Sequence, residues 1–340
     1  MSRLPSVTAA TRPATLRAQG RRPWVVPLFA LLLAGAFVLA LALGSVPVAP
    51  ADLWTLLTGG DAGTAGAVVT ALRLPRAVAA AACGGLLALA GALMQVLLRN
   101  PLADPYVLGV SGGAAVGALL SMLFGLAGVL LELSAFAGAL AAMIVVFGLA
   151  HGAGSRTPTR LLLTGVIVSA GCGAAVSFIL AVASERSLRG MLFWLMGDAS
   201  TADRPAVAAA MLIAGLIVCA PLARDLNLLA RGDTTAQTLG VPVGRLRIVV
   251  YLLASALTAV SVSSVGSVGF VGLIVPHLVR LAFGNDQRLL LPVSALAGAT
   301  LLLLADTAAR TVVAPAQLPV GVLTALLGVP LFLFLLNRSR

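Results

Sequence analysis

The chain has 340 residues, of which 60% belong to the types AVILMFWYC and only 10% are charged. A soluble domain is about one quarter charged, so this composition excludes a water-soluble globule. All 22 basic residues are arginine, and a chain without lysine cannot form a phosphate-binding loop of the GxxxxGK[ST] type. The arginines lie singly or in pairs between apolar runs and form no basic stripe, so we expect no nucleic-acid partner.

The first 22 residues carry five arginines and no acidic residue. An apolar run from Trp24 to Leu43 follows, which is longer than the apolar core of a usual signal peptide. Because more apolar segments come after it, this run is predicted to be an uncleaved first membrane helix. Residues 1–22 are then expected to form a cytoplasmic tail, and residues 23–340 a single transmembrane domain.

Apolar segments recur along the rest of the chain, and each predicts a membrane-spanning helix. Asn100-Pro101, Asp104-Pro105 and the stretch 284–286 mark breaks between them. The predicted fold is all-α, a polytopic membrane protein with about ten transmembrane helices. The segments are 25–44, 76–98, 107–124, 126–150, 161–183, 205–223, 247–264, 268–283, 289–309 and 320–336.

The arginines also predict the direction in which the chain crosses the membrane. With ten crossings both termini share one side, and placing them in the cytoplasm leaves 16 arginines inside and 6 outside. This bias agrees with the positive-inside rule. The arginines expected outside are Arg73, Arg76, Arg186, Arg189, Arg204 and Arg310.

Few acidic side chains fall inside the predicted helices. Asp306 precedes Arg310 by four residues, a helical spacing that pairs opposite charges, and Glu132 is expected near the outer end of its helix. An ion-coupled carrier would use a membrane-embedded acid, so this class stays open as an alternative. The scarcity of such acids argues against it.

No pattern of metal ligands is visible in the sequence. The three cysteines, Cys83, Cys172 and Cys219, lie apart in apolar segments without CxxC spacing and are expected to serve packing. His277 follows Pro276 with no second ligand close in sequence, which favours a structural role. An intramembrane enzyme would need a cluster of metal ligands or a nucleophile, so that class is disfavoured too.

Six blocks of sequence resemble one family of membrane proteins. Taken in chain order, the six blocks are similar to the permease subunits of the FecCD family of ABC importers. This family includes permeases for ferric siderophores, haem and cobalamin. The resemblance runs from about residue 50 to the end of the chain. The blocks are LRLPRAVAAAACGGLLALAGALMQVLLRNPLADPYVLGVSGGAAVGA (72–118), LLLTGVIVSAG (161–171), MLFWLMGD (191–198), LNLLARGDTTAQTLGV (226–241), GSVGFVGLIVPHLVR (266–280) and QLPVGVLTALLGVPLFLFLL (317–336).

The resemblance implies a type II ABC importer permease architecture in the bacterial inner membrane. It implies a dimer of permeases, expected to be a homodimer, with a translocation path at its axis. Two ATP-binding cassette subunits would dock on the cytoplasmic side and a periplasmic substrate-binding protein on the other. No cofactor is implied, and the chain itself is not expected to be an enzyme. Iron chelate, as ferric siderophore or haem, is the expected cargo because most of the family carries it, and cobalamin stays open as the alternative.

The resemblance places ATPase coupling in the cytoplasmic loop 225–246. There the sequence predicts two short helical pieces, LNLLA and TTAQTLG, around Arg231, Gly232 and Asp233. Without the resemblance an ordinary connector would be the preferred interpretation. With it, Leu228, Thr235, Leu239 and Gly240 are the expected ATPase contacts.

Arg73, Arg76 and Arg310 are expected to dock the binding protein, because arginines at these motif positions of the family face its surface glutamates. Arginine suits this role, since its planar guanidinium binds a carboxylate in two places. The alternative is that these side chains only snorkel toward the membrane interface.

Further roles are expected for small and polar residues of other segments. Ser169 and Ser177 lie on one face of the fifth segment, which the resemblance places beside the path, although such a stripe more often serves helix packing. Pro276, with the nearby glycines Gly266, Gly269 and Gly272, predicts a kinked helix. This helix would deliver His277 and Arg280 to the ATPase side as a hinge or contact. Phe193 and Trp194 are expected to anchor a short outer helix at the membrane interface.

Overall fold

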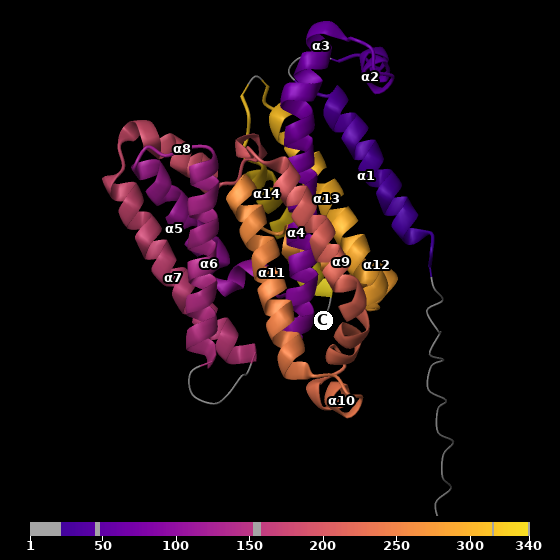
Figure 1. Cartoon of the computed structure of the whole chain (residues 1–340), viewed down its shortest axis with the longest axis vertical. Coiled ribbons are helices and arrows are strands. Elements are labelled where there is room, and N and C mark those ends of the chain that lie inside the picture. Colours follow the sequence, from indigo (N-terminus) through magenta and orange to yellow (C-terminus); the bar gives the residue numbers. More distant parts are fainter. Residues whose placement is uncertain (1–21, 45–47, 152–157, 315, 339–340) are drawn as a thin grey trace, which may run out of the picture.

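The computed structural model describes residues 22–44, 48–151, 158–314 and 316–338. It is all-helical in these residues, and Figure 1 shows most helices running along one long axis. The helix α3 (Gly63–Val68) lies at one end of this axis and α10 (Asp233–Thr238) at the other, and we call these ends the α3 face and the α10 face. The predicted tail 1–22, apart from Arg22, lies outside the described residues, as do Arg156 and Arg340.

Ten helices of the described chain account for the ten predicted spans. Seven are long and apolar enough to cross a membrane, and three more are shorter apolar helices. They are α1 (Val25–Ala42), α4 (Leu74–Leu97), α5 (Val110–Leu123), α6 (Val129–His151), α7 (Pro158–Val182), α9 (Pro205–Leu229), α11 (Val243–Val265), α12 (Val271–Phe283), α13 (Gln287–Thr311) and α14 (Val320–Arg338). The shorter elements between them are α2 (Pro50–Leu57), the π-helical η1 (Val69–Arg73), the 3-10 turns η2 (Pro105–Leu108) and η3 (Ala199–Thr201), and α8 (Glu185–Leu195).

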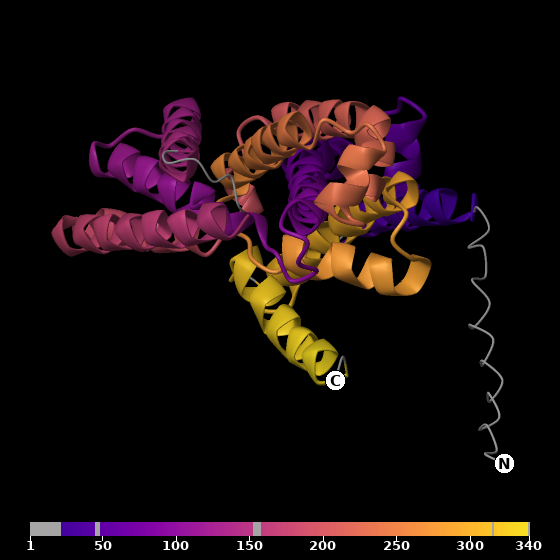
Figure 2. The same ribbon diagram turned by 90° about the horizontal axis from the view of Figure 1, so that it is seen from below.

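The helix α4 lies at the centre of the molecule, where α9, α11, α12 and α13 surround it (Figure 2). Nearly all of its side chains beyond Ala77 are buried, and most are alanine, glycine or leucine. Small residues let backbones approach closely: a Cβ atom on Gly84 would overlap the carbonyl oxygen of Gly298 in α13, and one on Gly91 would overlap that of Gly272 in α12. Lipid supplies no hydrophobic drive between helices, so such close packing holds them together.

A second group, formed by α5, α6 and α7, stands beside this centre (Figure 2). The contact of α5 with α6 follows the same rule, because Gly113 of α5 and Gly138 of α6 lie backbone against backbone. The outer helix α7 buries few of its side chains, as a helix facing lipid or another subunit would. The molecule therefore has a tightly packed centre and a more open flank.

The helical run that contains α4 is longer than a membrane requires. From Gly63 to Leu97 it extends for 35 residues without a break, whereas about 20 residues span the hydrocarbon core. Its first part, α3 and η1, lies at the α3 face above the packed centre (Figure 1). Arg73 is the last residue of this extension and is buried.

The chain departs from helical structure before Pro276 and not at it. The helix α12 runs through Pro276, whose missing amide removes only one hydrogen bond in the second turn. The irregular stretch is instead 266–270, where Gly266 and Phe270 both have positive φ angles, of 70° and 69°. The hydroxyl of Tyr106 donates to the carbonyl of Val268 and accepts from its amide, both at 2.9 Å, and so satisfies the backbone there. The predicted bend was attributed to Pro276 together with Gly266, Gly269 and Gly272, and the irregular backbone lies at the glycine end of that stretch.

The short outer helix predicted around residues 186–198 is present as α8, but one of its aromatic residues does not lie at an interface. Trp194 is only 1% exposed and belongs to the core, so its prediction as an interfacial anchor is wrong. The reason is the close approach of the Trp194 carbonyl to Gly266, where a Cβ atom would overlap it. This contact draws the end of α8 into the molecule, while Phe193 stays half-buried beside Arg189.

Substitution of Gly84 by valine should destabilise the protein strongly. Overpacking of a core costs roughly 1–3 kcal/mol, and here the added atoms meet the backbone of α13, which cannot rotate away. We expect an apparent melting temperature in detergent several degrees lower. Gly35→Val in α1 is the matched control, because nothing lies within 4 Å of a Cβ atom at Gly35. Equal melting temperatures for the two variants would contradict this packing.

Candidate functional site

Two of the predicted docking arginines fasten the end of α1. Arg73, at the end of η1, donates through Nη1 to the carbonyls of Leu41 and Ala42, at 2.6 and 3.0 Å. Arg310, in the last turn of α13, donates to the carbonyl of Ala40. The last carbonyls of a helix lack partners within the helix and carry its negative dipole end, so two cations stabilise it there.

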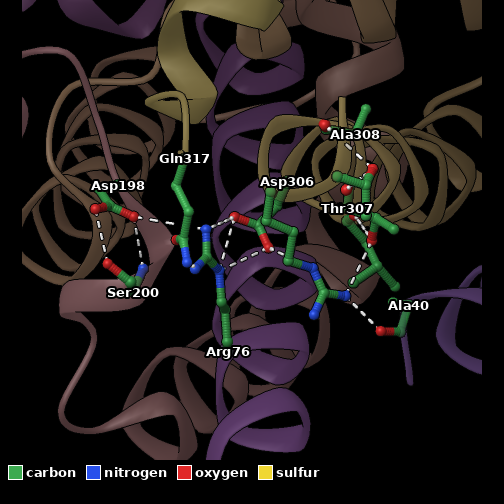
Figure 3. Close-up of polar contacts among 11 residues, drawn as sticks. Ala40, Arg76, Asp198, Ser200, Asp306, Thr307, Ala308 and Gln317 are labelled. Atoms are coloured by element: carbon green, nitrogen blue, oxygen red, sulfur yellow. Dashed lines mark hydrogen bonds and ion pairs between the residues drawn. The ribbon is translucent and has the colours of Figure 1, made fainter. Parts of the chain in front are cut away.

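Arg76, in the first turn of α4, forms a bidentate ion pair with Asp306 of α13 (Figure 3). Its Nε lies 3.1 and 3.0 Å from the two carboxylate oxygens, and its Nη2 lies 2.9 Å from Oδ1. The carboxylate is 1% exposed. The other guanidinium edge donates to Gln317 at 2.8 Å and lies 3.8 Å from Asp198.

The predicted pairing of Asp306 with Arg310 is present, but at 4.0 Å it is not the principal one. Spacing of four residues brings Arg310 near, yet the packing of α4 against α13 brings Arg76 into direct hydrogen-bonding contact. Because Arg76 and Asp306 are 230 residues apart, no local pattern in the sequence could have shown this pair.

A cavity of about 470 Å³ opens between these arginines at the α3 face. Arg73, Arg76 and Arg310 line it together with Ser200 and Gln317, and none of the described residues lining it is acidic. The structure thus brings together all three predicted docking arginines, each bound to other parts of the chain and each reaching the cavity wall. Such a cavity can accept an anionic group.

The predicted coupling loop lies at the α10 face (Figure 1). Its first part, LNLLA, is no separate piece, because α9 continues to Leu229 as one helix. Leu228 is half-buried there and packs against the core. The second piece is present as α10, in which Thr235 is exposed, and Leu239 and Gly240 follow it on the surface.

The other predicted residues lie apart from these two places. In α7, Ser169 is half-buried near Gly109, and Ser177 is exposed with its hydroxyl donating to the carbonyl of Gly173 at 3.0 Å. In α12, His277 is half-buried and Arg280 donates through Nε to Asn285 at 3.0 Å. Glu132 lies in the first turn of α6.

The side chains that hold the predicted coupling loop in place could not be recognised in the sequence. Arg247 of α11 donates to both carboxylate oxygens of Asp233, at 2.9 and 2.8 Å. Asn227, near the end of α9, bonds to Asp286 and Gln287 at the start of α13. Asp286 stands at a recognisable helix start after Gly284, but its partner Asn227 could be found only in three dimensions.

The arrangement of long apolar helices agrees with what the sequence blocks imply. A model of the FecCD transport family matches residues 31–338 of the chain. The chain belongs to this family. It is therefore the permease subunit of an ABC importer, and not an enzyme.

Relatives of this FecCD permease carry different cargoes. It is 43% identical over 277 residues to the hemin transport system permease protein HmuU of Yersinia pestis, covering 79% of this chain and 83% of the relative. It is 43% identical over 317 residues to the Fe(3+) dicitrate transport system permease protein FecD of Escherichia coli, covering 91% and 97%. It is also 43% identical over 277 residues to the cobalamin import system permease protein BtuC of Halobacterium salinarum, covering 81% and 74%.

A solved structure has the same fold as this FecCD permease. It is described as an inward-facing conformation of a metal-chelate type ABC transporter, and its chain is 33% identical to this one. The two superpose with a TM-score of 0.81 over 93% of this chain and 99% of the other. The helices therefore have the arrangement of a type II ABC importer permease.

The Arg76 and Asp306 pair should show strong coupling in a double-mutant cycle. Arg76→Ala leaves a buried carboxylate without its bidentate partner, and breaking such a pair costs about 3–5 kcal/mol. Arg76→Ala/Asp306→Ala removes both charges, so it should be more stable than Arg76→Ala alone. Thermal unfolding of the purified variants in detergent measures the stability of the single and the double variants. Additive losses would mean that the pair is not formed.

Proposed function

We propose that this FecCD permease imports an iron chelate, either a ferric siderophore or haem. The main support is its similarity to the permeases for hemin and for Fe(3+) dicitrate, each at 43% identity. The solved structure that it resembles is of a metal-chelate type transporter, which agrees with this cargo. An ion-coupled carrier is no longer a competing hypothesis, because an ABC importer draws on ATP.

Cobalamin is the second candidate cargo. Besides the archaeal relative, a vitamin B12 import permease of Salmonella paratyphi A is 40% identical over 329 residues, or 95% of this chain. Identity alone does not separate the two cargoes, since the archaeal cobalamin relative and the two iron-chelate relatives are all 43% identical to this chain. We place iron chelate first because two of the relatives and the structural neighbour favour it.

We further propose that two copies of the chain, residues 23–340 of each forming one permease domain, enclose the path in the bacterial inner membrane. Both termini would lie in the cytoplasm, on the α10 face, as the arginine bias favours. Two ATP-binding cassette subunits would contact the exposed residues Thr235, Leu239 and Gly240, with Leu228 supporting them from α9. A short exposed helix between two membrane spans can transmit the rigid-body motion of a soluble partner.

At the other face, a periplasmic substrate-binding protein would dock over the arginine cavity. Its surface carboxylates could enter a space that three guanidinium groups line and that no described acidic residue occupies. Arginine binds carboxylates in two places and keeps its charge, which makes such a contact strong and specific. The bonds of Arg73 and Arg310 to α1 hold these groups in fixed positions before docking.

The mechanism that we propose is alternating access. ATP binding brings the two ATPase subunits together, their movement passes through α10, and the path between the two permeases opens on one side and then on the other. Ser169 and Ser177 of α7 would line this path. Pro276, His277 and Arg280 of α12 would act as a hinge or contact near the ATPase side.

Uptake by the source cells tests the cargo. Cells lacking this chain should lose accumulation of radiolabelled ferric siderophore or hemin and regain it when the chain is supplied again. Unchanged iron uptake with loss of labelled cobalamin would replace the first cargo by the second. Uptake of all three compounds unchanged, in cells with no second permease of this family, would overturn both.

Gln317→Glu tests docking without removing an arginine. The new carboxylate would lie where the amide oxygen now accepts from Arg76 at 2.8 Å and would compete with carboxylates of the binding protein. We expect the dissociation constant of the binding protein for the reconstituted transporter to rise about tenfold, since charge repulsion of this kind costs on the order of 1 kcal/mol or more. Gln317→Ala is the control, and we expect little change from it. Equal affinities for both variants would argue against docking in this cavity.

A further inference from the structure

Asn227 joins the end of α9 to the start of α13 through both halves of its amide. Its Nδ2 donates to Oδ1 of Asp286 at 2.8 Å, and its Oδ1 accepts from the backbone amide of Gln287 at 2.9 Å. Asp286 is the N-cap of α13 and also accepts from the amide of Arg288 at 3.1 Å. The first amides of a helix lack partners within the helix, so Asn227 completes the cap from another part of the chain.

Six residues later, Asp233 fixes the first turn of α10. It accepts two hydrogen bonds from Arg247 of α11 and lies 3.9 Å from Nη2 of Arg99, the residue that follows α4 closely. Arg99 adopts a left-handed conformation with φ of 48°, which is uncommon for a residue other than glycine. The segment 227–233 is thus fastened at one end to α13 and at the other to α11 and the end of α4.

The helices α4 and α13 connect this segment to the arginine cavity. The helix α13 has 25 residues, about 37 Å at the usual rise, and carries Asp306 and Arg310 at its far end. The helix α4 runs from Arg76 at the cavity to the turn that contains Arg99. The two lie backbone against backbone at Gly84 and Gly298, and the Arg76 pair with Asp306 joins them at the α3 face.

We propose that Asn227 and Asp233 are positioning residues that fasten α10 to the α4 and α13 pair, so that the ATPase state and the affinity of the arginine cavity for the binding protein are linked. This inference rests on the proposed function, in which α10 contacts the ATPase. Linkage is reciprocal. If bound nucleotide changes the affinity of the transporter for the binding protein, the binding protein changes the affinity of the transporter for nucleotide by the same factor. A tightly packed pair of helices is suited to this, because it moves as one body.

An exchange of side chains between Asn227 and Asp286 tests the hydrogen bond itself. Asn227→Asp places two carboxylates together and should break the link. In Asn227→Asp/Asp286→Asn the donor and the acceptor change places: the new asparagine donates to the new aspartate and still caps Arg288. Asn100→Asp is the matched control, because Asn100 is an exposed asparagine of the same face that accepts from Leu102 at 2.9 Å, as an aspartate also can.

The measurement is the affinity of fluorescently labelled, substrate-free binding protein for the reconstituted transporter, with and without ATP and with a hydrolysis-deficient ATPase subunit. For linked sites, the affinities with and without ATP typically differ about 5- to 150-fold. In Asn227→Asp the ratio of these two affinities should fall to within about twofold of one. Affinity without ATP should stay as in the unmodified protein, which a general loss of structure would not allow. The double variant should restore the ratio, and Asp233→Asn should lower it as Asn227→Asp does.

The inference would be overturned by an unchanged affinity ratio in Asn227→Asp, or by a double variant in which the ratio is not restored. Should Asn227→Asp fail to assemble, Asn227→Ala takes its place with the same expected loss, since alanine has no side-chain donor for Asp286. Leu239→Glu separates this result from a failure of the proposed function. Leu239→Glu should weaken binding of the ATPase subunits. If it does not, the proposed contact of α10 with the ATPase is wrong, and not only the proposed role of Asn227 and Asp233.

Discussion

The structure depends on how closely other helices can approach α4. At Gly84 and Gly91 the backbones of α13 and α12 occupy the space where a side chain would stand. Helices in a membrane gain nothing from leaving lipid as such, so contact of this kind and the hydrogen bonds at helix ends must hold them together. The close packing of α13 on α4 also brings Arg76 and Asp306 together.

The polar side chains that interact across helices gather mainly toward the two faces. Burying a charge in a dry interior is costly unless the charge is paired or hydrogen-bonded, and Arg73, Arg76, Arg310 and Asp306 near the α3 face meet this condition. The middle of α4 carries little besides apolar and small residues. Such a distribution suits a subunit that moves its cargo without chemistry: the proposed binding surfaces lie at its ends, and the packed helices between them are suited to transmit motion.

Much of the fold could be predicted from sequence because each span carries its own signal. All ten segments were found from their length and apolar character, and the family blocks identified their arrangement. Contacts between distant segments could not be found this way. Asp306 was assigned to Arg310 by helical spacing, whereas the packing of α4 gives it Arg76 at closer range. Trp194 has the usual character of an interfacial residue, yet a backbone contact at Gly266 carries it into the core.

Because of the π-helical turn η1, the geometry of the cavity depends on a single inserted residue. Such a turn holds one residue more than an α-helical turn and amounts to a single inserted residue within a helix. Its last residue is Arg73, so the insertion sets the angle at which this arginine leaves the helix relative to Arg76. A relative that lacks the residue keeps the helix but rotates everything before it about the helix axis. The loss or gain of one codon at positions 69–73 can therefore remove or create one wall of the cavity while leaving the membrane-spanning part of the protein unchanged.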